Sequence, residues 1–207
     1  VLMEQMIVSH TEEKSVHANT NGVLFSRRQG EYRVSLMFSA HEGEKTSSFF
    51  GSDFVTDSLE KPFLSCGSVE KDLSDAEKQI ETVGVNGKFE GVMILTPSCL
   101  TEFLYYTLEN FAGEGALLSG TSPWKDKIGE KVASEELTLS VNPFDPRIVG
   151  GERVTSDGFP AENYDLIRDG VLLNFMTSLY GEKKLGVKRA PNSSGNFVLR
   201  PGNKSLE

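Results

Sequence analysis

Cysteine and histidine are scarce in this chain of 207 residues, which holds two of the first and three of the second. Cys66 and Cys99 are unclustered and too few for a disulfide framework, so both are expected to be buried free thiols in a reducing, cytoplasmic compartment. His10, His17 and His41 lie on different predicted strands without metal-ligand spacing, which favours ordinary strand or turn positions. These shortages argue against a disulfide-rich secreted scaffold.

Basic residues and long apolar runs are also lacking. Lys and Arg total 21 against 30 Asp and Glu, a formal net charge of −9, whereas nucleic-acid-binding proteins gather cations on one face. No signal peptide is expected, and no apolar run approaches the roughly 18 residues that a membrane span needs. With 38% hydrophobic and 25% charged residues the composition is that of a soluble globular protein, so neither nucleic acid nor membrane is an expected partner.

Short runs rich in β-branched and aromatic residues fill the first fifty positions. Val34, Leu36 and Phe38 alternate with Arg33, Ser35, Met37 and Ser39. This period of two is typical of a strand with one face exposed to solvent. Such runs predict an antiparallel meander, because strands joined by tight turns pair as neighbours. The predicted strands cover residues 3–9, 15–18, 23–26, 33–40 and 45–50, with turns at Glu12-Glu13, Asn21-Gly22, Gln29-Gly30 and Glu42-Gly43.

Two amphipathic helices are predicted after the meander. In residues 68–83 apolar positions recur at steps of four and three, and they are Val69, Leu73, Ala76, Ile80 and Val83. A turn at Asn86-Gly87 and a short buried strand at 92–95 lead to Thr96-Pro97, an N-cap followed by proline at the first helical position. The helix over 98–111 is expected to pack deeply, through Leu100, Phe103, Leu104, Leu108 and Phe111.

The stretch from Asp145 to Gly186 contains a hairpin preceded by a long glycine-rich loop. Its predicted strands, 163–167 and 171–176, are separated by Arg168-Asp169-Gly170, and Asp-Gly readily adopts the positive φ angles of a type I′ turn. Alternating apolar residues at 137–141 predict another strand, residues 179–185 a short helix and residues 197–199 a last strand.

These elements predict an α+β fold with an antiparallel β-sheet that could curl toward a barrel, and with two main packed helices. We expect residues 1–134 to form the meander with its two-helix region and residues 135–207 to begin a C-terminal β domain. The two parts are expected to pack together as one unit.

Several short motifs resemble, in order and spacing, those of the TldD/PmbA family, also named for modulation of DNA gyrase. They are Asn19-Thr20-Asn21-Gly22, the run from Lys88 to Pro97, and Asp145-Pro146, Ser156-Asp157-Gly158, the Leu166-to-Leu172 hairpin and Lys184-Leu185-Gly186. Family members are about twice this length. The resemblance and the terminal Leu206-Glu207, typical of a vector-encoded tag junction, suggest a piece that lacks the N-terminal domain and the last C-terminal strands.

The resemblance also implies where a metal would be bound. In the TldD branch the helix after the proline carries His-Glu-x-x-x-His, with two zinc ligands and a carboxylate that activates water. The matching positions here are Tyr105, Tyr106 and Asn110, which are poor ligands and no bases near neutral pH. No catalytic residue, metal or cofactor site is therefore expected, and the chain is similar to the PmbA (TldE) branch.

Other possible sites have ordinary explanations. Glu102 and Glu109 lie seven residues apart on one helix and could form an acid/base pair, but charges beside an apolar stripe are usually its solvated edge. Ser9 and His10 point to opposite faces of a strand and cannot begin a catalytic triad. Neither Gly113-Glu114-Gly115 nor Gly150-Gly151 has the setting of a phosphate-binding loop.

Two functions remain open. The resemblance implies a non-catalytic subunit that joins a TldD-like metallopeptidase subunit, or associates with itself, in a complex that degrades or matures peptides. The alternative is a stand-alone, non-enzymatic module that binds an extended peptide along a sheet edge. Co-expression with a TldD-like chain would separate the two.

Overall fold

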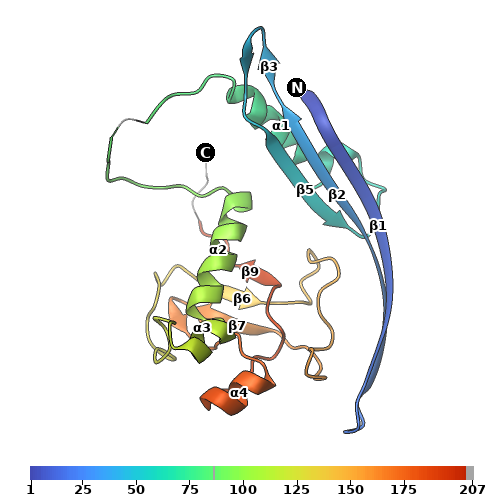
Figure 1. Ribbon diagram of the computed structural model, residues 1–207, viewed down its shortest axis with the longest axis vertical. Helices are drawn as coiled ribbons and strands as arrows, with labels where there is room; N and C mark the ends of the chain where they lie inside the picture. Colours follow the sequence, from blue (N-terminus) through green and yellow to red (C-terminus); the bar gives the residue numbers. More distant parts are fainter. Residues whose placement is uncertain (86, 204–207) are drawn as a thin grey trace. The chain divides into compact units, whose positions relative to one another are not determined.

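The computed structural model describes residues 1–85 and 87–203 (Figure 1). It contains two compact units, one of Val1–Val16 with Ser26–Gly91 and the other of His17–Phe25 with Val92–Glu207. The fold is α+β with antiparallel sheets, as predicted, and the sheets of the described residues are open. Asn86 of the predicted Asn86-Gly87 turn lies outside the described residues, as does Leu206-Glu207. The predicted division at residue 134 stays a prediction.

The sheet of the first unit has the order β1-β2-β5, formed by β1 (Leu2–Ala18), β2 (Leu24–Ser39) and β5 (Phe50–Thr56). The turn at Asn21-Gly22 is confirmed, and Gly22 has a φ of 85°. The turns predicted at Glu12-Glu13 and Gln29-Gly30 are wrong, because both pairs lie inside long strands.

The long strands accept these residues for specific reasons. Nearly all of β1 is exposed, so Glu12 can stay in a strand and form an ion pair with Arg28. Gly30 lies beside the His10 ring, whose Nε2 is 3.5 Å from the position of a Cβ on that glycine, an ordinary van der Waals contact. The same ring contacts Tyr32, with centroids 4.6 Å apart. The polar residues and the glycine at these two places therefore belong to the exposed part of the paired strands β1 and β2 and do not form turns.

Helix α1 (Val69–Lys78) packs on this sheet as predicted. Val69 and Ala76 are buried with Val34, Leu36 and Phe38, which form the core of the unit. The helix ends before the predicted Val83, which is 91% exposed. The remaining elements are β3 (His41–Glu42) and β4 (Lys45–Thr46), joined by the predicted turn at Gly43, and the 3₁₀ helix η1 (Phe63–Ser65).

The second unit contains a four-stranded antiparallel sheet of order β8-β7-β6-β9. The predicted hairpin is present, and its turn residues Asp169 and Gly170 have φ angles of 48° and 79°. The second strand of the hairpin ends at Leu172, earlier than predicted. The strands are β6 (Leu139–Val141), β7 (Tyr164–Arg168), β8 (Val171–Leu172) and β9 (Phe197–Leu199).

Three helices accompany this sheet, namely α2 (Pro97–Phe111), α3 (Glu114–Ser119) and α4 (Leu179–Leu185) (Figure 1). Thr96 is the N-cap of α2 and Pro97 its first residue, as predicted. Leu108 packs in the core of the unit, but Phe103 is 50% exposed. The expected deep packing of α2 is therefore wrong, because the short strands cover only part of its apolar face.

Two further predictions fail in this unit. Residues 92–95 do not form a buried strand: Val92 is 92% and Ile94 70% exposed. A strand needs a hydrogen-bonding partner, and none of the described strands pairs with this segment. Cys99 is exposed, whereas Cys66 in the first unit is buried as expected. None of the helices in the described ranges is long and apolar enough to cross a membrane.

Candidate functional site

Helix α2 carries the three positions at which the family resemblance places a zinc motif. Tyr105 is 51% and Tyr106 67% exposed, and their rings meet edge to face with centroids 5.8 Å apart. The amide of Asn110 donates a hydrogen bond of 2.7 Å to the carbonyl oxygen of Tyr106. A phenol or an amide is a weak zinc ligand, so this helix surface does not have the donor set of a metallopeptidase centre.

The other residues singled out from the sequence do not converge. Glu102 and Glu109 are both exposed on α2. The hydroxyl of Ser9 donates to the carbonyl oxygen of Arg33 at 3.4 Å. Among residues 1–85 and 87–203, no three His, Cys, Asp or Glu side chains lie close enough to hold a metal ion.

One contact between a serine and a histidine was not expected from the sequence. The Oγ atom of Ser39 lies 2.8 Å from both Glu4 Oε1 and His41 Nε2. Ser39 is only 3% exposed, so its hydroxyl is closed to a substrate. The cluster is best explained as a way of satisfying a buried polar group.

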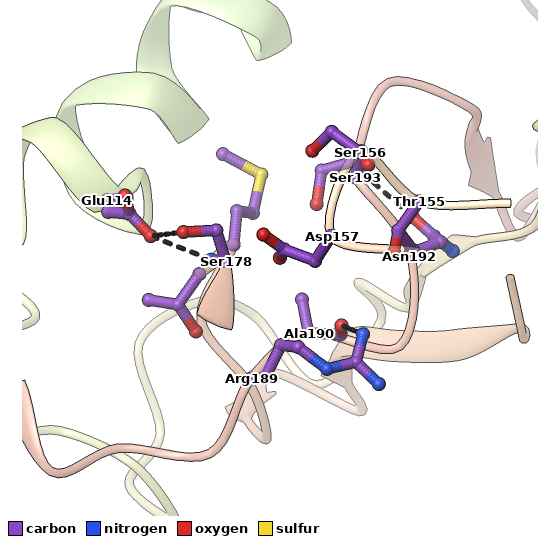
Figure 2. Close-up of a pocket in the computed structure, with 12 residues that line it drawn as sticks. Glu114, Thr155, Ser156, Asp157, Ser178, Arg189, Ala190, Asn192 and Ser193 are labelled. Atoms are coloured by element: carbon purple, nitrogen blue, oxygen red, sulfur yellow. Dashed lines mark hydrogen bonds between the residues drawn. The ribbon is translucent and has the colours of Figure 1, made fainter. Parts of the chain in front are cut away.

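A polar cavity with a volume of about 190 Å³ lies in the second unit (Figure 2). Three loop segments, residues 155–157, 176–178 and 189–194, line it together with Glu114. Two of these segments flank α4, and the first belongs to the glycine-rich loop before the hairpin. Residues up to 80 positions apart in the sequence therefore meet here, and we take this cavity as the candidate site.

Glu114, the first residue of α3, holds the start of α4 in place. Its Oε2 atom accepts hydrogen bonds from the backbone N–H and the hydroxyl of Ser178, at 2.7 and 2.6 Å, and from the N–H of Gly181 at 3.1 Å. Ser178 is also the N-cap of α4. The carboxylate thus satisfies N–H groups that a helix start leaves without intrahelical partners. The Gly113-Glu114-Gly115 motif has a structural role at this point.

Asp157 enters the cavity from the Ser156-Asp157-Gly158 turn (Figure 2). Its Oδ2 atom accepts a hydrogen bond of 2.8 Å from the backbone N–H of Leu179, which ties the turn to α4. Gly158 has a φ of 84°, and a Cβ there would lie 2.9 Å from Nε2 of His17. Only glycine fits this position without displacing a neighbour.

Arg189 lines the same cavity and is held on two sides. Its Nη1 atom donates to the carbonyl oxygen of Ala190 at 2.7 Å, and its guanidinium lies 4.0 Å from the centroid of the Phe159 ring. Stacking on an aromatic ring restricts the orientation of a guanidinium while leaving its in-plane N–H donors accessible.

The loop after Arg189 is anchored by Asn192, which is 3% exposed. The amide of Asn192 donates to the carbonyl oxygens of Val141 and Glu162 at 3.2 and 2.9 Å. The hydroxyls of Ser194 and Tyr164 lie 2.6 Å apart, and burial raises the pKa of Tyr164 to about 12. The phenol therefore stays protonated over the physiological range and serves as a fixed hydrogen-bonding group.

Sequence reasoning found part of this cavity. Asp157 belongs to a motif quoted for the family resemblance, and Glu114 was considered as part of a phosphate loop, a role that its contacts do not support. Arg189, Asn192 and Ser193 were missed. The signal that could have pointed to them is the polar Asn-Ser-Ser-Gly run at 192–195, in which Ser194 has a φ of 59°.

Comparison with known proteins finds relatives in the PmbA/TldD family. Residues 90–207 match the PmbA/TldA metallopeptidase C-terminal domain. The chain is 24% identical to a metalloprotease from Methanothermobacter thermautotrophicus, over 95% of its own length and 46% of that protein. It is 26% identical over 81 residues to the metalloprotease PmbA from Escherichia coli O157:H7, covering 39% of this chain and 18% of that protein.

Solved structures share the fold. TldE from Thermococcus kodakarensis superposes with a TM-score of 0.76 at 19% identity, over 97% of this chain and 48% of that one. A putative modulator of DNA gyrase from Bacteroides thetaiotaomicron gives 0.79 at 22% identity, over 98% and 47%. The chain thus spans about half or less of the length of the relatives it matches.

Proposed function

The chain belongs to the PmbA/TldD metallopeptidase family, and on that premise we propose that it is a PmbA/TldE-like subunit without a catalytic metal. In this proposal it joins a TldD-like subunit, which supplies the zinc chemistry, in a complex that degrades or matures peptides. The observation that supports it is the surface of α2, where Tyr105, Tyr106 and Asn110 stand at the positions of the zinc motif. These side chains supply neither ligands nor a general base.

Co-expression tests this proposal. The chain is produced with a TldD-like subunit from the same source, and the mass of the purified material is measured by light scattering. A stable heteromer whose peptidase activity is lost when His-Glu-x-x-x-His of the partner is altered supports the subunit role. Two separate species that never co-purify would rule it out.

A second candidate is a stand-alone module that binds an extended peptide. The supporting observation is that β1 is an edge strand of the β1-β2-β5 sheet, so one side of its backbone has no strand partner among the described residues. Free backbone N–H and C=O groups on an edge strand can pair with a peptide. Binding by this mode should be abolished when alternate amide nitrogens of the peptide are methylated, while binding through side chains alone would survive.

A further inference from the structure

We propose that the cavity between Asp157 and Arg189 binds a zwitterionic ligand of one or two amino-acid residues. Its ammonium group would contact Asp157, and its carboxylate would contact Arg189. This inference does not depend on the subunit role, because Glu114 and all three lining segments belong to this chain. It rests on hydrogen-bond donors and acceptors that line the cavity and have no partner among the described residues.

The acceptor side of the cavity is Asp157. Only Oδ2 of its carboxylate is used, by the N–H of Leu179, so Oδ1 has no partner within the described residues. The hydroxyls of Ser156 and Ser193 likewise have no hydrogen bond to other described residues, and both serines line the same cavity as Asp157 (Figure 2). One carboxylate oxygen and two hydroxyls provide the acceptors that an ammonium group requires.

The donor side is Arg189. Its Nη1 atom is bonded to Ala190 and its guanidinium is stacked on Phe159, whereas Nε and Nη2 have no partner in the described part of the chain. The remaining donors of an oriented guanidinium fit the two oxygens of a carboxylate. Because the side chain is already held, little conformational entropy is lost when a ligand binds.

The balance of charge selects a ligand that carries both signs. Glu114 also lines the cavity, but Oε2 of its carboxylate already accepts the N–H groups at the start of α4. Its Oε1 atom has no partner among the described residues, so Glu114 adds a second open acceptor beside Asp157, while Arg189 supplies the cation of the cavity. A simple anion would be repelled by Asp157 and a simple cation by Arg189, whereas a zwitterion satisfies both.

Size limits the ligand further. A volume of about 190 Å³ is below the range typical of drug-sized ligand pockets and suits one or two residues. The cavity is also preformed, since hydrogen bonds of Glu114, Asp157 and Asn192 fix its walls. A preformed small polar cavity favours a compact polar ligand over a long peptide.

Calorimetric titration of the full chain with alanine and with alanylalanine tests the proposal. Binding of either probe is expected, and which one binds tells a free amino acid from a short peptide. For the probe that binds, acetylation of its amine or amidation of its carboxylate should weaken binding about tenfold or more. If both blocked forms bind as tightly as the zwitterion, or neither probe binds, the proposal is wrong.

Variants locate the binding. Asp157→Asn keeps an oxygen that can accept the Leu179 N–H, and Arg189→Gln removes the cation. Each variant should lower the affinity for the zwitterionic probe about tenfold or more. Lys125→Gln and Asp126→Asn, exposed charges outside the cavity, are the matched controls and should bind as the wild type does. Unchanged affinity in both cavity variants, with wild-type melting curves, would overturn the assignment. If a cavity variant does not fold, the blocked probes on the wild-type chain still decide.

Discussion

The carbonyl oxygen of Ala133 lies 2.5 Å from the point at which a Cβ atom on Gly170 would stand. The carbonyl oxygen of Ser134 lies 2.7 Å from the same point. Gly170 also donates its N–H to Leu137, at 2.9 Å, and accepts from Val132, at 2.8 Å. The hairpin turn thus packs against residues 132–137. Position 170 requires glycine because its φ is positive and because a side chain there would clash with backbone atoms.

Gly170→Ala should destabilise the chain by about 2 kcal/mol or more, because strain at positive φ adds to a clash with backbone atoms. Gly120→Ala is the matched control, since Gly120 has a φ of 73° and nothing within 4 Å of its added Cβ. The control should lose only about 1 kcal/mol. Chemical denaturation measures both, and equal losses would show that the contacts with Ala133 and Ser134 carry no cost.

Glu114→Ala should lower the unfolding free energy by about 1–3 kcal/mol, because three hydrogen bonds to the start of α4 lose their acceptor. Glu102→Ala, an exposed glutamate on α2, is the control and should change stability by less than about 0.5 kcal/mol. Amide exchange should also speed up in residues 179–185. Equal melting of the two variants would refute the capping role.

The buried phenol of Tyr164 predicts a loss of stability at alkaline pH. Its pKa is about 12 in the folded chain against 10 when free, so above pH 10 the unfolded state releases a proton that the folded state keeps. Stability contributed by the protonated phenol is complete below pH 10 and declines as the pH rises toward 12. Between pH 9 and pH 11 the loss should reach about 1 kcal/mol.

Tyr164→Phe isolates this effect, because other groups titrate in the same range. The wild type should lose more stability than the variant over that pH interval, as measured by denaturant titration at each pH. Parallel pH profiles for the two proteins would show that Tyr164 ionises normally.

Zinc should not bind tightly to the chain. Tyr105, Tyr106 and Asn110 lack the chemistry of zinc ligands, and Cys66 and Cys99 do not cluster with other candidate ligands among the described residues. Any histidine tag is removed first, and the chain is then dialysed against zinc. Elemental analysis of the dialysed chain should find much less than one zinc per chain. A TldD-like protein with an intact motif is the positive control, and about one retained zinc per chain here would refute the prediction.

Local chemistry was sufficient for several elements. The turn at Asp169-Gly170, the Thr96-Pro97 start of α2 and the face of α1 that carries Val69 and Ala76 follow from φ preferences, capping and periodicity, which act within a few residues. The family resemblance likewise rested on short motifs, and the match over residues 90–207 confirms it.

Errors arose where an exposed surface or a missing neighbour governed the outcome. Gln29-Gly30 looks like a turn, yet β2 continues through it, paired with β1, and Gly30 lies beside the ring of His10. Residues 92–95 have the composition of a buried strand but have no pairing partner in the described sheets. Strand formation depends on hydrogen bonds to a second segment, and the pattern of the local sequence does not show whether such a segment is present.

The candidate cavity shows the same division most clearly. The sequence alone specifies the Ser156-Asp157-Gly158 turn, a glycine-rich loop and the residues available at the zinc-motif positions, since each is a property of a few adjacent residues. Asp157 and Arg189 line one cavity although they are 32 positions apart in the sequence, and one carboxylate oxygen of Glu114 binds Ser178, 64 positions away. Both contacts depend on distant segments folding against each other. Such contacts arise from packing around a shared core, where distant side chains compete for the same few hydrogen-bonding partners.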